Sequence, residues 1–187
     1  TVRVPPYLPD VPEVRKDIAE LNIAVQDVDN YIGKILKALD ETGLAKNTIF
    51  VYTTDHGIGF PGAKGTLFEP GIEISLLIKG PKGFNGGKTI ENMVSNMDIF
   101  PSLLEACGLD IPKQVQGKSF WPMVLNKTNK TREEIFVEQT FHAGYDPMRG
   151  IRTEQYKYIK NFEKRPFWYP PNTDGGYTKE WYRSNHP

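Results

Sequence analysis

Residues 47–81 read NTIFVYTTDHGIGFPGAKGTLFEPGIEISLLIKGP, and this stretch contains the pattern that decides the fold. Apolar runs lie within residues 48–55 and 73–81, and the second run ends at a Gly-Pro pair. Because neither run alternates regularly between apolar and polar residues, each is typical of a strand that is covered on both faces, as in a parallel sheet. A glycine-rich loop connects the two predicted strands.

A long amphipathic helix is predicted before the first of these strands. Apolar residues recur at three- and four-residue steps from Val14 to Leu39, and Gly43 is placed to end the helix. The proline-rich residues 1–11 predict an extended connector. Since a helix followed by a buried strand is half of a β-α-β unit, we expect a fold of the α/β class.

A second helix is predicted at residues 89–108, where apolar positions again follow helical spacing. It contains Cys107, the single cysteine of the chain, which we expect to be a buried packing residue. One cysteine excludes an internal disulfide. We therefore expect residues 1–112 to form an α/β core, with helices flanking a sheet.

Short strands are predicted after this core, at residues 133–140, 148–154 and 156–162. A tight turn separates the last two, which indicates a hairpin. The aromatic and proline-rich end of the chain is expected to be loop with little regular structure. We therefore expect residues 113–187 to form a small antiparallel β subdomain with an aromatic tail.

The composition excludes several classes of partner. Lysine and arginine total 23 and aspartate and glutamate total 23, so the chain offers no overall charge that would attract nucleic acid or an anionic membrane. Its apolar runs all fall short of the roughly 20 residues that cross a bilayer. The chain begins in a connector without Met or an apolar signal core, so we expect it to be part of a longer protein.

The candidate chemistry lies just past the first predicted strand, at Asp55 and His56. Ligands of open α/β sheets bind where strands end, and a carboxylate beside an imidazole offers one oxygen and one nitrogen to a divalent metal. Lys64 lies nine positions after Asp55, in the glycine-rich loop, where an ammonium is able to meet an anion. An ordinary glycine loop also produces such a pattern, so the residues alone leave both interpretations open.

Several segments resemble the sulfatase family of the alkaline-phosphatase-like superfamily. They are, in family order, ALDETGLAKNT, TTDHG, AKGTLFEPG and ISLLIKGP, followed by SNMDIFPSLLEACGLDIP, QGKSFWPMVL and MRGIRTEQYKYI. The resemblance covers about residues 14–162. GIGFPGAKGTLFEPG and EQTFHAGYDPMRGIRTEQYKYI are most similar to the heparan N-sulfatase (N-sulfoglucosamine sulfohydrolase) branch. The resemblance to sulfatases implies that the chain is the C-terminal part of an alkaline-phosphatase-like sheet, followed by the antiparallel subdomain.

The resemblance assigns roles to individual residues. Asp55 and His56 would bind a divalent cation, usually Ca²⁺ in this family. Histidine in place of the commoner asparagine leaves Mn²⁺ possible. Lys64 would contact the sulfate group during catalysis. Four further residues would line the pocket and contact the sugar, although a surface-loop role of the histidine stays equally open: Glu138, His142, Asp146 and Arg149.

The family nucleophile is a formylglycine made from Cys or Ser in a C-x-P-x-R type of motif, and none of the cysteine or serine residues here lies in one. We expect this motif, and two metal-binding aspartates, upstream of residue 1. The chain would then be inactive alone and have two partners, the N-terminal part of the same protein and a sulfated carbohydrate of glycosaminoglycan type. The reaction would be hydrolysis of a sulfate ester or a sulfamate. Relatives suggest a periplasmic, secreted or lysosomal location.

Two other functions stay open. An Asp-His pair after a strand also suits a phosphodiesterase or phosphonate monoester hydrolase of the same superfamily. Alternatively, the chain is a non-catalytic carbohydrate-binding relative whose aromatic tail stacks on sugar rings. The upstream nucleophile would distinguish the first alternative, and sugar binding that survives loss of Asp55, His56 and Lys64 would support the second.

Overall fold

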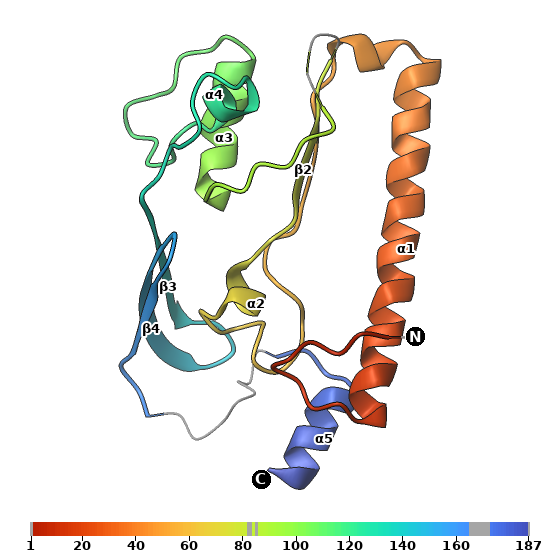
Figure 1. Cartoon of the computed structure of the whole chain (residues 1–187), viewed down its shortest axis with the longest axis vertical. Helices are drawn as coiled ribbons and strands as arrows, with labels where there is room; N and C mark the ends of the chain where they lie inside the picture. Colours follow the sequence, from red (N-terminus) through yellow and green to blue (C-terminus); the bar gives the residue numbers. More distant parts are fainter. Residues whose placement is uncertain (1, 82–83, 85, 165–172, 187) are drawn as a thin grey trace. The chain divides into compact units, whose positions relative to one another are not determined.

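The computed structural model describes residues 2–81, 84, 86–164 and 173–186. These residues form two compact units that are interleaved in sequence (Figure 1). The first unit comprises Thr1–Lys82, Gln139–Pro147 and Phe162–Pro187, and the second comprises Gly83–Glu138 and Met148–Asn161. The predicted division of the chain at residue 112 stays a prediction. None of the described helices is long and apolar enough to span a bilayer.

The first unit is built on the predicted long helix, which is confirmed as α1, Pro12–Glu41. Proline at the first helical position suits a helix start, because an N–H at that position has no hydrogen-bond acceptor within the helix and its absence costs nothing. At the other end the Thr42 amide still bonds to Ala38 O at 3.0 Å, and Gly43 then turns the chain at a φ of 73°. A short 3₁₀ turn, η1 (Leu44–Asn47), leads to the first strand.

Both predicted strands of this unit are present, as β1, Phe50–Thr53, and β2, Leu76–Lys79. They pair antiparallel, with Phe50 opposite Lys79 and Thr53 opposite Leu76, so the predicted parallel arrangement is wrong. The connection, residues 54–75, is long enough for a crossover, but its helix is the one-turn α2 (Glu69–Ile72), whereas parallel strands are usually joined by a longer helix that carries the chain back to the starting edge. Full burial is wrong as well, because β2 alternates between half-buried and exposed residues.

The core of the first unit gathers around Leu8, Val14 and Ile18, with Tyr7 and Tyr182 packed against it. Burial, together with the smaller effect of the neighbouring Tyr182, raises the pKa of Tyr7 to about 12. The C-terminal helix α5, Tyr177–Asn185, packs beside α1 (Figure 1).

The predicted irregular tail is therefore wrong for residues 177–185. This helix is completed by a tertiary contact: the Asp17 carboxylate accepts hydrogen bonds from the Tyr177 and Thr178 amides at 3.2 and 2.7 Å. A cap that lies 160 residues away in the sequence leaves no local signal. The preceding aromatic and proline-rich residues 165–172 lie outside the described residues.

The second unit contains the predicted second helix in a shorter form. A 3₁₀ turn, η2 (Asn96–Asp98), leads into α3 (Ile99–Ala106), and the one-turn α4 (Trp121–Val124) follows. Cys107 lies beyond the end of α3, where Gly108 turns the chain at a φ of 71°. Its side chain is exposed rather than buried, because the helix that would have turned it toward the core has already ended.

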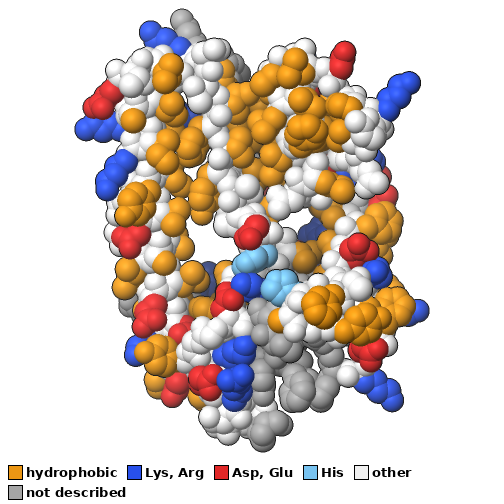
Figure 2. All heavy atoms as spheres, turned by 180° about the vertical axis from the view of Figure 1, so that it is seen from behind, with side chains coloured by type: hydrophobic (Ala, Val, Ile, Leu, Met, Phe, Trp, Pro, Cys, Tyr) orange, Lys and Arg blue, Asp and Glu red, His pale blue; other side chains and the backbone are white. Residues whose placement is uncertain are grey.

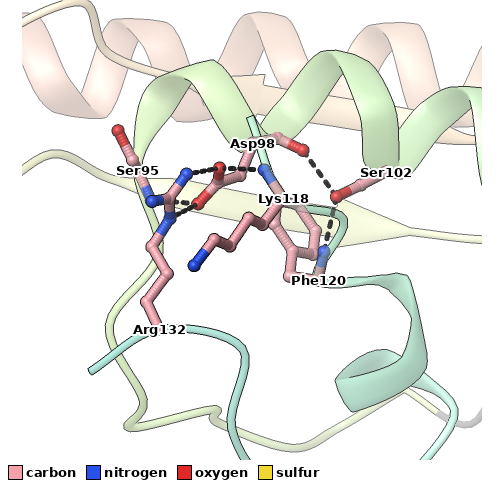
Figure 3. A network of polar contacts seen from close by, with 6 residues as sticks. All are labelled: Ser95, Asp98, Ser102, Lys118, Phe120 and Arg132. Atoms are coloured by element: carbon pink, nitrogen blue, oxygen red, sulfur yellow. Dashed lines mark hydrogen bonds and ion pairs between the residues drawn. The ribbon is translucent and has the colours of Figure 1, made fainter. Parts of the chain in front are cut away.

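A network of polar contacts fixes the start of α3 (Figure 3). Asp98 is 0% exposed, and its carboxylate accepts hydrogen bonds from the Ser95 and Lys118 amides at 2.8 and 2.7 Å and from the Arg132 guanidinium. Ser102 donates to the Asp98 carbonyl and accepts from the Phe120 amide. These bonds join three stretches of the unit around one buried carboxylate.

The predicted strands after residue 112 are confirmed as β3, Glu134–Phe141, β4, Tyr145–Thr153, and β5, Lys157–Asn161. They form a three-stranded sheet in the order β3-β4-β5. The predicted hairpin is β4 with β5, which pair antiparallel and are closed by a tight turn. The α/β class with an antiparallel C-terminal sheet is therefore confirmed.

Candidate functional site

Asp55 and His56 follow β1 directly, where the two-stranded sheet ends. The last sheet-like contacts join Thr54 and Ser75, and the chain then turns away. Asp55 Oδ1 lies 3.6 Å from His56 Nε2, and the two side chains are 89% and 41% exposed. Adjacent residues at a strand end normally point to opposite sides, so the turn is what brings both donor atoms to one place.

The imidazole of His56 is oriented by the backbone. Its Nδ1 lies 2.6 Å from Gly57 O. A carbonyl oxygen only accepts, so Nδ1 must carry the hydrogen, and in the neutral ring the lone pair then resides on Nε2. This is the nitrogen that faces Asp55 Oδ1. In metal sites, a hydrogen bond from the other ring nitrogen to a carbonyl is how proteins orient a metal-ligating histidine.

The Asp55–His56 pair fits a divalent cation. Two donors that each lie about 2.3–2.6 Å from Ca²⁺, at a right angle, would be roughly 3.3–3.7 Å apart. The observed separation is 3.6 Å. Within the described part of the chain no group of three or more His, Cys, Asp or Glu side chains could hold a metal, so a cation at this pair would need further ligands. The metal role of both residues stays a prediction.

The glycine-rich loop folds back on itself tightly. The Gly57 amide bonds to Gly71 O at 3.0 Å, and a Cβ at Gly57 would lie 1.8 Å from Pro70 O. A Cβ at Gly71 would lie 2.3 Å from Ala63 O. Glycine is required at both positions because backbone meets backbone there.

Lys64 lies in this loop, between Gly62 and Gly65, which have φ values of 75° and 76°. Its amide bonds to Ile58 O at 3.1 Å, so the loop returns to within two residues of the histidine. The Lys64 side chain is 19% exposed, and its Nζ donates to Asp174 Oδ1 at 2.7 Å. The contact of Lys64 with a sulfate stays a prediction.

Asp174 is the residue that sequence reasoning missed. It lies 110 residues from Lys64, in a Thr-Asp-Gly-Gly stretch that is typical of an ordinary turn. No spacing rule connects it to the glycine-rich loop. An acidic residue in an otherwise aromatic tail was the available signal, and it is a weak one.

The four predicted sugar contacts lie in and around the β3-β4 turn. Glu138 and Arg149 form an ion pair at 3.0 Å, and both are well exposed. His142 is exposed in the turn itself, and its amide bonds to Gly144 O. Asp146 is 1% exposed, and its carboxylate accepts a hydrogen bond from Gln139 at 3.0 Å. The structure thus brings Glu138 and Arg149 together, and the sugar-binding role of all four residues stays a prediction.

Comparisons with known proteins decide the family. A family model described as sulfatase matches residues 8–109, and a model described as N-sulphoglucosamine sulphohydrolase, C-terminal, matches residues 60–182. The chain belongs to the sulfatase family. Both the sulfatase resemblance and its C-terminal placement are therefore confirmed, including the match to the N-sulphoglucosamine sulphohydrolase branch.

This sulfatase chain is similar to proteins from distant organisms. It is 29% identical to an ulvan-active sulfatase of Formosa agariphila over 90% of this chain, and 27% identical to human N-sulphoglucosamine sulphohydrolase over 89%. A solved structure described in complex with its substrate, D-glucosamine-2-N,6-O-disulfate, matches at 30% identity over 75% of the chain, with a TM-score of 0.66.

The sulfatase chain spans about a third of these relatives. The shares are 28% of the Formosa protein, 35% of the human protein and 31% of the solved structure. The likeness of fold confirms that the two sheets and their helices are part of an alkaline-phosphatase-like fold.

Proposed function

We propose that this chain forms the cation-binding and anion-binding part of a sulfatase that hydrolyses a sulfate ester or sulfamate on a glycosaminoglycan-type sugar. The observation that carries the proposal is the Asp55–His56 pair, whose two donor atoms are 3.6 Å apart on exposed side chains. Asp55 and His56 hold the divalent cation, and Lys64 holds the sulfate group. Calcium is the first candidate, because the site offers a hard carboxylate oxygen, and Mn²⁺ is the second.

Each side chain has a distinct part in the reaction. When bound, the cation would polarise the sulfate oxygens and stabilise charge in the transition state. Asp55 contributes negative charge to its site, and His56 contributes the Nε2 lone pair that the bond to Gly57 O leaves available. The ammonium of Lys64 faces the oxygen on which negative charge develops, inside a loop that shields it from most solvent. The formylglycine nucleophile belongs to the remainder of the protein.

The proposed sugar specificity rests on the relatives. The human relative is named for N-sulphoglucosamine, and the solved structure holds a glucosamine that is sulfated on nitrogen and on oxygen 6. The exposed Glu138–Arg149 pair and the exposed His142 offer both charges and an imidazole to sugar hydroxyl, amide and sulfate groups. These residues are the proposed sugar contacts, together with Asp146.

The N-terminal part of the same protein is the proposed macromolecular partner. Apolar side chains reach the solvent along α1, at the left of Figure 2. Contiguous exposed apolar residues of this kind mark surfaces that another element covers. The large ones on α1 are between 39% and 63% exposed: Ile23, Val25, Val28, Tyr31 and Ile35. The chain alone is accordingly proposed to be inactive.

The test uses the full-length protein that contains this chain. We expect it to release sulfate from glucosamine N-sulfate or glucosamine 6-O-sulfate, and we expect a chelator to abolish the release. Lys64→Ala should lower kcat/KM about a hundredfold or more, as for the loss of one charge-stabilising donor. Lys46→Ala is the matched control, because Lys46 is an exposed lysine of η1. Turnover of a phosphodiester probe without sulfate release would instead support a phosphodiesterase.

A further inference from the structure

The proposed mechanism does not use a contact that joins the glycine-rich loop to the C-terminal segment. Lys64 Nζ donates to Asp174 Oδ1 at 2.7 Å, and both residues belong to the first unit. We infer that Asp174 is a positioning residue, which holds the Lys64 ammonium where the substrate oxyanion will bind. This inference rests on the proposed role of Lys64.

The geometry of the ammonium supports this assignment. A lysine ammonium has three donors, and the bond to Asp174 uses one of them. The other two remain for the oxygens of an anion. Lys64 has a flexible four-carbon stem, so an anchored end spares the enzyme part of the entropy cost of fixing that stem in each turnover. At 19% exposure, the stem and ammonium are already largely enclosed.

Asp174 fits against the backbone of the loop. A Cβ at Gly59 would lie 2.4 Å from Asp174 Oδ2, so this carboxylate rests on the bare backbone of Gly59. Gly59 does not have a positive φ, so its backbone conformation does not exclude a side chain. A side chain is excluded because it would collide with the Asp174 carboxylate. One carboxylate oxygen therefore faces Lys64, and the other faces the loop two residues before Pro61.

Hydrogen bonds also fix the residues that precede and follow Asp174 in the sequence. Thr173 is 3% exposed, and its carbonyl accepts a hydrogen bond from the buried Lys179. Asp17 holds the amides of Tyr177 and Thr178. With fixed points immediately before it and three residues after it, Asp174 is a rigid support rather than an end of a loose tail.

The experiment compares three variants of the full-length protein: Asp174→Ala, Gly59→Ala and Gly175→Ala. The first removes the carboxylate, and the second displaces it while leaving its charge. Gly175→Ala is the matched control, since a Cβ at Gly175 meets nothing within 4 Å. We expect Asp174→Ala and Gly59→Ala each to lower kcat for sulfate release about tenfold, as for other residues that orient a catalytic group, with a smaller effect on KM. Gly175→Ala should match the wild type.

A double-mutant cycle with Lys64→Ala separates positioning from a purely structural role. Asp174→Ala should have no further effect in the Lys64→Ala background, because the carboxylate acts through the ammonium. If Lys64→Ala leaves no measurable turnover, the affinity of each protein in the cycle for inorganic sulfate is measured by calorimetry instead.

Three outcomes would overturn the inference: an unchanged kcat in a folded Asp174→Ala protein, an equal loss in both backgrounds, or a rise in kcat, which would mean that Asp174 competes with the substrate anion. Activity that needs Lys64 but not Asp174 would leave the proposed function intact. A wild-type protein that releases no sulfate would instead reject the proposed function.

Discussion

At the scale of single residues, buried and exposed carboxylates have different roles in this chain. Asp55 is 89% exposed and keeps its oxygens available, whereas Asp98 is fully buried and its oxygens are occupied by the Ser95 and Lys118 amides and the Arg132 guanidinium. The hydrogen bond to Asp98 raises the pKa of Arg132, so the guanidinium stays charged. Only the exposed carboxylate is free to serve a ligand.

Replacement of Asp98 should therefore be among the costliest changes in the second unit. Asp98→Ala would leave the Arg132 guanidinium, which is 12% exposed, without its counter-charge, and loss of one partner of such a buried pair costs about 3–5 kcal/mol. Urea denaturation would measure this loss of stability. Asp110→Ala, at an exposed aspartate after α3, is the control and should stay within about 0.5 kcal/mol of the wild type. A loss below about 1 kcal/mol for Asp98→Ala would show that the network contributes little.

At the scale of elements, the local sequence pattern predicted the helices and hairpins that local interactions form. The helix α1 and the β4-β5 hairpin follow from the spacing of apolar residues and from a tight turn, and both are present. The apolar runs gave the wrong pairing direction for β1 and β2, because they indicated strands covered on both faces, as in a parallel sheet, whereas every second residue of β2 is exposed. Helix α5 was missed because its N-terminus is capped by Asp17, from the far end of the chain.

The cap on α5 gives a prediction for that element. Asp17→Ala should remove both hydrogen bonds to the first amides of α5 and cost about 1 kcal/mol, as for other helix caps. Amide hydrogens of α5 should then exchange roughly fivefold faster, with those of β5 unchanged. Asp27→Ala, at an exposed aspartate of α1, is the matched control. Unaltered exchange in α5 after Asp17→Ala would mean that packing against α1 holds the helix without the cap.

At the scale of the whole molecule, the site combines what sequence could predict with what it could not. Asp55, His56 and Lys64 were identifiable because they lie within ten residues, after a strand and among glycines. Asp174 was not, because its contact with Lys64 forms only when distant segments fold together. The membership of the sulfatase family confirms the family resemblance, while the chain spans only 28–35% of the relatives named above.

This partial span has a measurable consequence for cation binding. Asp55 and His56 offer two ligands, whereas Ca²⁺ takes six to eight oxygen-type ligands, so the chain alone should bind Ca²⁺ with a Kd on the order of millimolar or weaker. Calorimetric titration of the 187-residue chain, beside the full-length protein, would measure the difference. Asp55→Ala should abolish the residual heat, and Asp27→Ala should not. Micromolar affinity in the chain alone would mean that it completes the coordination shell itself, and the proposal that the remaining ligands come from the N-terminal part would then fail.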